Sequence, residues 1–552
     1  MAEQSKKKEK NFLIQGSILA IAGVITKIIG AVYRIPLVNI LGDEGMGYYG
    51  VAFQIYAIAL TLTSYSLPLA VSKLVSARVA NGQYKNAYKV FRGALAFAIT
   101  VGGTVALLIF FGADFIAKNL MAMEFSSYAL RVLSPCILIV ALLGVFRGFF
   151  QGNGTMVPTA ISQIIEQIVN AVVSIGGAYF LLKAGMAVAE KKGEEAYGQA
   201  YAAAGGTLGT VIGALSALLF LLVLFAVYQK VFKKQMRRDK GRKAEGYKYI
   251  LKILLLTIAP VLLSSTVYNL CGVIDNAMFG TIMSAQGYPE SEYAALLGIF
   301  SGKYDTIINV PLAFSSALAS SLVPSLVATA QTGDRKQIHA KIDLFSRFNM
   351  LIAIPAAVGI AVLAKPILDL LFFTENNETG ALMLQIGALS VVFYCLSTVT
   401  NAVLQGLDDM MTPVKSAAIS LVIHVIALFI MMVVFKWGIY AVVVSKIVFS
   451  ASACILNSHA LRERIGYVQE KKRAFIIPAI ASAIMGAVTY GVYSLLKYFI
   501  GARISTLVAL CVAVAVYAVA LVLLGGVTEK EMMQMPKGHL LVKICKKVHL
   551  FK

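Results

Sequence analysis

Ionisable side chains inside apolar stretches are the residues of this sequence most able to do chemistry. A charge at the centre of a bilayer costs about 2.5–3.5 kcal/mol even on insertion scales. Such a side chain is therefore kept where it lines water, pairs with an opposite charge or binds a charged ligand. Seven positions qualify: Lys27, Arg34, Glu166, Asp275, Lys303, Asp305 and Lys446.

Each of these charges also has a structural explanation. Arg34 can extend to the outer headgroups, and Asp275 can be satisfied by its own helix or a neighbour. Lys303 and Asp305 are too close in sequence to share a helical face, so we expect no ion pair between them. Lys27 lies about 15 residues into the first apolar stretch, or roughly 22 Å along a helix. It is the charge that is hardest to explain without a function.

The signs of these charges point to a class of ligand. Cationic side chains on the first and eighth apolar stretches suit an anion such as a phosphate or diphosphate, because charge-assisted hydrogen bonds are short and strong. A carrier of organic cations would need carboxylates to dominate. Glu166, Asp275 and Asp305 balance the bases here, so the signs favour an anionic ligand without establishing it.

The composition indicates the class of fold. Of 552 residues, 59% are apolar and 14% are charged, and the mean hydropathy is +0.79. Soluble domains have about 45–50% apolar and 25% charged residues, so a soluble enzyme, disorder and coiled coil are excluded. We predict an all-α polytopic membrane protein with 14 transmembrane helices. The predicted spans are 12–33, 48–72, 91–112, 127–149, 157–182, 205–229, 253–281, 296–330, 348–373, 380–405, 413–435, 438–458, 474–496 and 504–526.

The basic residues predict the orientation of these helices. The net charge is +22, and most of the 49 Lys and Arg fall in alternate connections, Arg147 among them. Positive residues favour the cytoplasmic side, so both termini are predicted inside. The charge is then explained by anionic membrane lipid, and no nucleic acid partner is expected. The long stretches at 253–281 and 296–330 are each expected to carry a kink or an extra turn.

Several motifs lead away from catalysis. The six Cys form no CxxC pair, and we expect no metal site and no cofactor. Residues 45–50 satisfy G-x-G-x-x-G but lie in no βαβ unit, so we reject dinucleotide binding and expect these glycines to form a turn. His424 stands alone in an apolar stretch and is predicted to be a hydrogen-bonded packing residue.

An internal repeat organises the chain. Two stretches match at an offset of about 250 residues, which predicts two six-helix lobes related by an axis along the membrane normal, as in some transporters. The matches are Gln151-Gly152 with Gln405-Gly406, Pro158 with Pro413, and Gly82, Lys85 and Asn86 with Gly333, Lys336 and Gln337. The predicted parts are an N-terminal lobe at 1–229, a basic linker at 230–252, a C-terminal lobe at 253–460, two further helices at 461–527 and a basic tail at 528–552.

Specific strings make the chain resemble a known family. Fourteen spans in two lobes plus two helices resemble the multidrug/oligosaccharidyl-lipid/polysaccharide exporter superfamily. The strings are similar to those of its stage V sporulation protein B branch, which is related to MurJ-type lipid II flippases. They are Thr26-Lys27-Ile28-Ile29-Gly30, Tyr33-Arg34-Ile35-Pro36, Leu41-Gly42-Asp43-Glu44-Gly45, Phe149-Phe150-Gln151-Gly152, Pro158-Thr159-Ala160-Ile161-Ser162-Gln163, Glu166-Gln167, Tyr304-Asp305 and Asn309-Val310-Pro311.

The resemblance implies a transporter and not an enzyme. It implies movement of an undecaprenyl-diphosphate-linked saccharide, lipid II or a related precursor, across the bacterial cytoplasmic membrane. Lys27, Arg34 and Lys303 would bind the diphosphate. Cell-wall synthesis enzymes are the partners it suggests, and the last two helices would form a groove for the lipid tail.

Three alternatives follow from the same residues. In the flippase, Glu166, Asp275 and Asp305 would balance charge and couple transport to an ion gradient or the membrane potential. In a cation-coupled multidrug exporter, transport would depend on Glu166 and Asp275 and be indifferent to Lys27. A membrane scaffold for cell-wall or spore-coat enzymes would tolerate neutralisation of every intramembrane charge.

Overall fold

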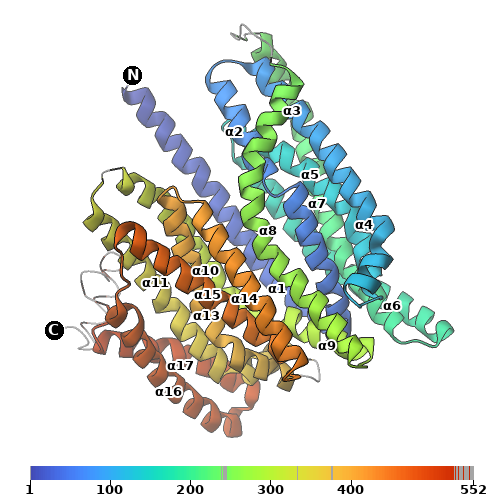
Figure 1. Cartoon of the computed structure of the whole chain (residues 1–552), viewed down its shortest axis with the longest axis vertical. Helices are drawn as coiled ribbons and strands as arrows, with labels where there is room; N and C mark the ends of the chain where they lie inside the picture. Colours follow the sequence, from blue (N-terminus) through green and yellow to red (C-terminus); the bar gives the residue numbers. More distant parts are fainter. Residues whose placement is uncertain are drawn as a thin grey trace. The chain divides into compact units, whose positions relative to one another are not determined.

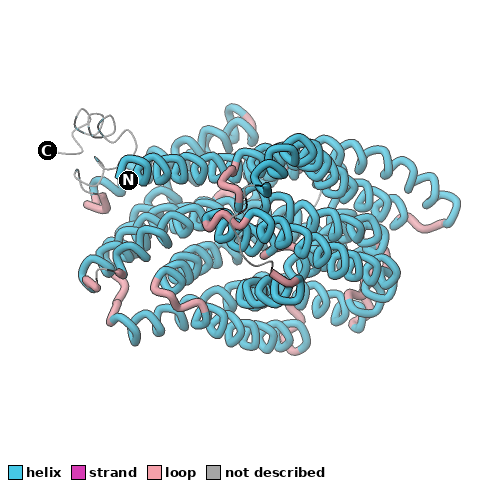
Figure 2. Tube along the Cα trace, turned by 90° about the horizontal axis from the view of Figure 1, so that it is seen from above, coloured by secondary structure: helices cyan, strands magenta, loops and turns pink. Residues whose placement is uncertain are grey.

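The structure is a computed structural model in which every regular element of the described residues is a helix (Figure 2). It describes residues 2–237, 239, 245–331, 333–373 and 377–527, together with 529, 533, 539, 542 and 546 of the tail. The all-α prediction is therefore confirmed over these ranges.

The chain divides into two compact units, Met1–Gly302 and Lys303–Lys552. Unit 1 contains α1 (Ala2–Thr63), α2 (Leu67–Ala80), α3 (Tyr84–Phe97), η1 (Ala98–Gly102), α4 (Gly103–Phe115), η2 (Ile116–Leu120), α5 (Ser126–Gly152), α6 (Val157–Lys192), α7 (Ala196–Arg237), α8 (Tyr247–Ala285) and α9 (Glu290–Gly298). The π-helical segment η3 (Ile299–Tyr304) follows α9. Unit 2 contains α10 (Asp305–Ala330), α11 (Arg335–Val362), α12 (Ala364–Leu371), α13 (Asn377–Gly406), α14 (Met411–Val433), α15 (Ile439–Ile465), η4 (Lys472–Ile476), α16 (Ile477–Ile500) and α17 (Ala502–Leu523) (Figure 1).

The described residues contain 12 helical stretches long and apolar enough to cross a membrane, against 14 predicted segments. Two differences account for this. One 60-residue stretch, Ile21–Ala80, contains the predicted segment 48–72 and overlaps the predicted segment 12–33 from residue 21 onward. The predicted segment 253–281 lies in the 39-residue helix α8, which is not among the twelve. The protein is thus a multi-pass membrane protein, with twelve candidate spans established.

Helix α1 is interrupted at Gly42. A continuous helix of its 62 residues would be about 93 Å long, three times the hydrocarbon core of a bilayer. Gly42 has φ 66° and ψ −179°, a conformation open to glycine because it has no Cβ. The prediction of a turn at residues 45–50 is therefore wrong. The break lies at Gly42, and residues 45–50 are helical.

The glycines after the break serve close helix packing. A Cβ placed on Gly47 would lie 2.0 Å from the carbonyl oxygen of Ala294 in α9. On the other helix, a Cβ placed on Gly298 of α9 would lie 1.6 Å from the carbonyl oxygen of Asp43 in α1. Backbones approach this closely only where side chains are absent, so α1 and α9 are in direct contact along these glycines.

The predicted irregularity at 296–330 is confirmed. This stretch is not one helix, because the π-helical turns of η3 separate α9 from α10. A π segment widens the helix by one residue per turn and is frequent at functional sites. The stretch at 253–281, by contrast, runs as part of a single helix, α8.

Two turns that match in sequence also match in backbone conformation. Gly82 before α3 and Gly333 before α11 both have φ 70°. Helices α5 and α13 end at Gly152 and Gly406, and two residues later Gly154 and Asp408 both have positive φ, 85° and 62°. The two sequence matches therefore correspond to the same backbone turns. The lobe boundaries at 229 and 253 stay a prediction.

Each unit has its own apolar core. In unit 1, aromatic rings from α3, α5 and α7 meet, with Phe91 and Phe149 ring centres 4.6 Å apart and Phe149 and Phe232 5.1 Å apart. In unit 2, Leu322 and Leu326 of α10 pack with Val403 of α13. Buried aromatic pairs of this kind contribute energy beyond their area, so each unit is held by its own contacts.

The replacement Gly47→Ala tests the contact between α1 and α9. The added methyl group must displace backbone, so we expect a loss of about 1–3 kcal/mol, measured as a lower melting temperature in detergent. The matched control is Gly176→Ala in α6, where no atom lies within 4 Å of the added Cβ. Equal melting temperatures for the two variants would contradict the packing described.

The second repeat turn carries an acidic cap, Asp409. Its carboxylate accepts hydrogen bonds from Thr412, 3.0 Å from the backbone N–H and 2.7 Å from the hydroxyl, and pairs with Arg464. Burial alone would raise the pKa of Asp409, but these hydrogen bonds and the Arg464 guanidinium lower it below its ordinary value of 3.8. The folded state therefore prefers the charged form.

This lowered pKa predicts a pH dependence. The charged carboxylate stabilises the fold above about pH 4 and stops doing so as the pH falls through the lowered pKa. Wild type should melt higher than Asp409→Asn at pH 7, and the difference should shrink at pH 3. The neighbouring exposed residue supplies the control, Asp408→Asn, which should follow wild type throughout. A difference that is constant with pH would exclude this role for Asp409.

Candidate functional site

The first two candidate cations lie on one face of α1. Lys27 and Arg34 are seven residues apart, so they point the same way about 10 Å apart along the helix. Lys27 is exposed, as are its apolar neighbours Val24 and Ile28. Arg34 is half-buried, and its Nη2 donates a 3.0 Å hydrogen bond to the carbonyl oxygen of Ser301 in η3.

The guanidinium of Arg34 is only partly satisfied. Its Nε is buried and has no hydrogen-bond partner among the described residues. Guanidinium offers five N–H donors and binds planar anions through two of them at once. Arg34 is therefore anchored to η3 at one end and retains donor capacity beside Lys27.

Helix α6 presents a polar face to the same part of α1. Asn170 donates to the hydroxyl oxygen of Tyr33 at 3.3 Å, and a Cβ on Gly30 would lie 3.2 Å from Nε2 of Gln167. The polar residues recur at the spacing of one helical face. They are Gln163, Glu166, Gln167, Asn170 and Ser174. Only Glu166 of these was predicted from the sequence to be a site residue, although their spacing forms a polar stripe within an apolar span.

Glu166 forms an ion pair with Arg147, which was predicted to lie in a connection between two spans. Arg147, near the end of α5, donates through Nη2 to Oε2 of Glu166 at 2.6 Å and through Nε to the hydroxyl of Ser162 at 2.9 Å. The side chains are 13% and 28% exposed. Glu166 is thus compensated by Arg147, a residue that was assigned no role from the sequence because it directly follows the uncharged stretch 132–146.

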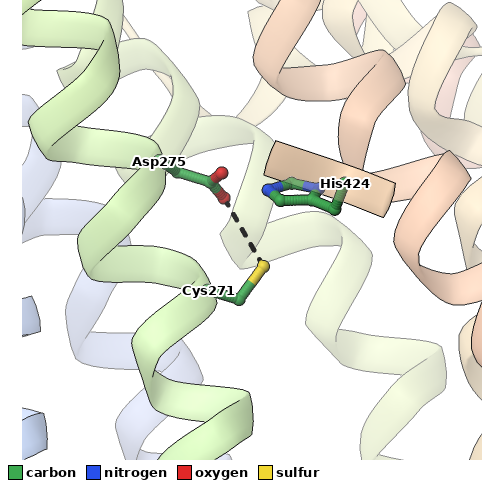
Figure 3. Close-up of side chains that lie close together, drawn as sticks. All are labelled: Cys271, Asp275 and His424. Atoms are coloured by element: carbon green, nitrogen blue, oxygen red, sulfur yellow. Dashed lines mark hydrogen bonds between the residues drawn. The ribbon is translucent and has the colours of Figure 1, made fainter. Parts of the chain in front are cut away.

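Asp275 is buried within α8. Its Oδ2 accepts from the thiol of Cys271 at 4.0 Å, and Figure 3 shows these two side chains one helical turn apart. Near them, a Cβ on Gly272 would meet the amide of Gln54 in α1 at 2.8 Å. A buried acid in a membrane helix must be compensated locally, and Asp275 has interactions beyond this thiol.

Lys303 is the last basic residue of η3 and is completely buried. A buried ammonium group needs partners, and Lys303 has them. The adjacent Tyr304 hydroxyl lies 3.3 Å from the hydroxyl of Ser390. The side chain of Lys303 is therefore engaged within the protein in this conformation and not exposed to a ligand.

Asp305 pairs with Lys446 in unit 2. Nζ of Lys446, in α15, lies 3.1 Å from Oδ1 of Asp305 at the start of α10. The sequence predicted no ion pair between Asp305 and Lys303, but it did not predict Lys446 as the partner of Asp305. Both side chains are less than a quarter exposed, so this ion pair accounts for the charge of Lys446 within its apolar stretch.

His424 behaves as predicted for a packing residue. Its Nδ1 lies 2.8 Å from the carbonyl oxygen of Ser445, and its ring meets that of Phe449 edge-on at 5.9 Å. Both contacts come from α15, so His424 links α14 to α15.

The comparisons with known proteins identify the family. A model described as "Polysaccharide biosynthesis protein" matches residues 13–330, more than half of the chain. The chain is 27% identical to the uncharacterized membrane protein YabM of Bacillus subtilis (strain 168) over 98% of both chains. It is 25% identical to the lipid II flippase MurJ of the same organism over 75% of both, and 34% identical to its stage V sporulation protein B over 29% of this chain and 31% of the relative.

Solved structures confirm the fold. A multidrug resistance MATE family transporter of the MOP superfamily, in its inward-facing conformation, matches with TM-score 0.66 and 17% identity over 80% of this chain and 94% of that chain. The lipid II flippase MurJ in an inward closed conformation matches with TM-score 0.62 and 16% identity over 91% and 97%. The chain therefore belongs to the family described as "Polysaccharide biosynthesis protein", and it shares the fold of these two solved membrane proteins.

The ion pair of Arg147 with Glu166 can be tested by exchanging its charges. Arg147→Gln and Glu166→Gln should each destabilise the protein by about 1–3 kcal/mol, because each leaves a charge poorly compensated. The double variant Arg147→Glu with Glu166→Arg should recover part of the loss. Melting temperature in detergent provides the measurement.

The control for this exchange is the exposed pair Lys365–Glu378, 2.6 Å apart. Surface pairs contribute about 0–1 kcal/mol, so Glu378→Gln should melt close to wild type. If Glu166→Gln also melts like wild type, the pair does not hold α5 to α6.

Proposed function

We propose that this protein is a flippase that moves a polyprenyl-diphosphate-linked saccharide, lipid II or a related polysaccharide precursor, across the bacterial cytoplasmic membrane. The observation that carries the proposal is the row of two cations on α1, Lys27 and Arg34, in a chain similar to a lipid II flippase over three quarters of its length. A diphosphate needs such donors to leave water.

The exposed ammonium of Lys27 would meet the diphosphate first, and the free donor capacity of Arg34 would fix its orientation. Lys303, the third predicted ligand of the diphosphate, is buried in this conformation and would not meet the headgroup in it. The polyprenyl chain would stay in lipid while two alternating states carry the headgroup. The last two helices, α16 and α17, would receive the tail.

The charge pairs argue against the multidrug exporter. A cation-coupled exporter needs a carboxylate that exchanges cations, yet Glu166 and Asp305 are each bound to a base. We therefore assign these two acids to charge balance. Asp275 is the remaining candidate for coupling to an ion gradient or the membrane potential. Efflux of organic cations that depends on Glu166 and not on Lys27 would reverse this choice.

The N-in, C-in topology belongs to the same proposal, as does an association with cell-wall synthesis enzymes. Cysteine accessibility from each side of the membrane tests the topology.

Transport in proteoliposomes tests the function. Purified protein should move a fluorescent polyprenyl-diphosphate saccharide between leaflets, and Lys27→Ala should lower the initial rate by at least about tenfold, because one charge-assisted contact is lost. Lys183→Ala, which removes an exposed lysine from α6, is the matched control and should transport normally.

Two results would contradict the proposal. Normal transport by Lys27→Ala, with the control also normal, would remove the headgroup contact. Absence of transport by wild type under an imposed ion gradient and membrane potential, with lipid II and a simpler lipid-linked glycan both tried, would remove the flippase function itself.

A further inference from the structure

The C-terminal end of α7 carries an organised cationic face. Lys230, Lys233, Lys234 and Arg237 recur at the spacing i, i+3, i+4 and i+7, and all four side chains are exposed. This spacing places them on one side of a helix. No acidic residue occurs within α7, so none of its own side chains neutralises them.

The opposite side of the same turns is fixed to the core of unit 1. Phe232 is 1% exposed, and its ring lies 5.9 Å from that of Tyr88 in α3 and 5.1 Å from that of Phe149 in α5. Met236, one turn later, packs against the same cluster. The rotation of α7 about its axis is therefore set, and its cationic face must point away from unit 1.

The cationic face continues an apolar stripe. Leu219, Val223, Val227 and Val231 repeat every four residues and are all exposed, Val223 and Val227 at 68% each. Lys230 and Lys234 lie three and seven residues after Val227, on the same side of the helix. Exposed valines in a membrane helix contact acyl chains, so the lysines begin where that contact ends.

Nearby acids are already engaged. Oε2 of Glu245 accepts from Nη2 of Arg78 at 2.6 Å, and Oδ2 of Asp239 accepts from the backbone N–H of Lys85 at 2.6 Å. Two exposed tyrosines, Tyr247 and Tyr249, begin α8 beside this region. Tyrosine gathers at the level of the headgroups, which places the end of α7 at the same depth.

We propose that the face formed by Lys230, Lys233, Lys234 and Arg237 binds the headgroups of anionic phospholipids. The apolar stripe holds the acyl chains and the cations hold the phosphates of the same lipid molecules. A soluble polyanion would find the four charges but could not use the stripe, and this difference selects a membrane lipid as the occupant. The site is separate from Lys27 and Arg34, so it does not depend on the proposed transport function.

The test uses the full chain in bilayers of phosphatidylcholine with a spin-labelled lipid. Wild type should associate more strongly with phosphatidylglycerol than with phosphatidylcholine at its surface. Replacing all four residues of the face with Gln should lower this preference at least about fivefold, since each basic residue near a charged surface contributes about that factor. High salt should also reduce the preference of wild type for phosphatidylglycerol, because salt screens the charges of the face.

The matched control removes four exposed basic residues elsewhere, with Lys415, Lys471, Lys472 and Arg473 each replaced by Gln. It should keep the preference, because the net charge changes equally but the α7 face is intact. A second variant exchanges lysine and arginine within the face, Lys230→Arg, Lys233→Arg, Lys234→Arg and Arg237→Lys. It should also keep the preference, even if the Gln variant folds poorly.

Three results would overturn the site. The Gln variant could keep its preference for phosphatidylglycerol, or the matched control could lose it equally. Inorganic phosphate at constant ionic strength could displace phosphatidylglycerol, which would make the face a site for free phosphate. Flipping of the saccharide cargo is a separate measurement, so failure here would leave the proposed function standing.

Discussion

The cost of an uncompensated charge in an apolar interior governs this protein. In each unit this cost is reduced by an ion pair between one base and one acid that come from different helices. In unit 1 Arg147 of α5 bonds Glu166 of α6, and in unit 2 Lys446 of α15 bonds Asp305 of α10. Because each pair joins two helices, the charges also fix how those helices meet. The exposed Lys27 stands outside this scheme.

The π-helical segment η3 connects two of the charged positions. It supplies the carbonyl oxygen of Ser301 that accepts from Arg34, and it carries the buried Lys303 two residues later. A π turn displaces the regular backbone bonding and makes a carbonyl available for a side-chain donor. The irregular backbone therefore gives Arg34 an anchor that a straight α-helix would withhold.

The sequence predicted what depends on local pattern. The length of the apolar stretches predicted the helices, and the isolation of His424 in an apolar stretch predicted its packing role. The repeat of two six-helix lobes stays a prediction. Contacts between side chains of different helices were harder to predict from the sequence. Arg147 was read as part of a connection, because hydropathy alone cannot tell the end of a span from a buried base whose partner is 19 residues away. The break in α1 was placed among glycines whose actual role is close packing, while Gly42, a few residues earlier, adopts the positive φ.

The turns after α5 and α13 show how a fixed backbone conformation limits the residue types that can occupy a position. Gly154 and Asp408 occupy equivalent positions and bend the backbone alike, although one lacks a side chain and the other has a charged one. Aspartate is among the few residues that tolerate this left-handed geometry. Substitution at either position is thus restricted to the few residue types that adopt a positive φ, whatever the side chains of the surrounding turn.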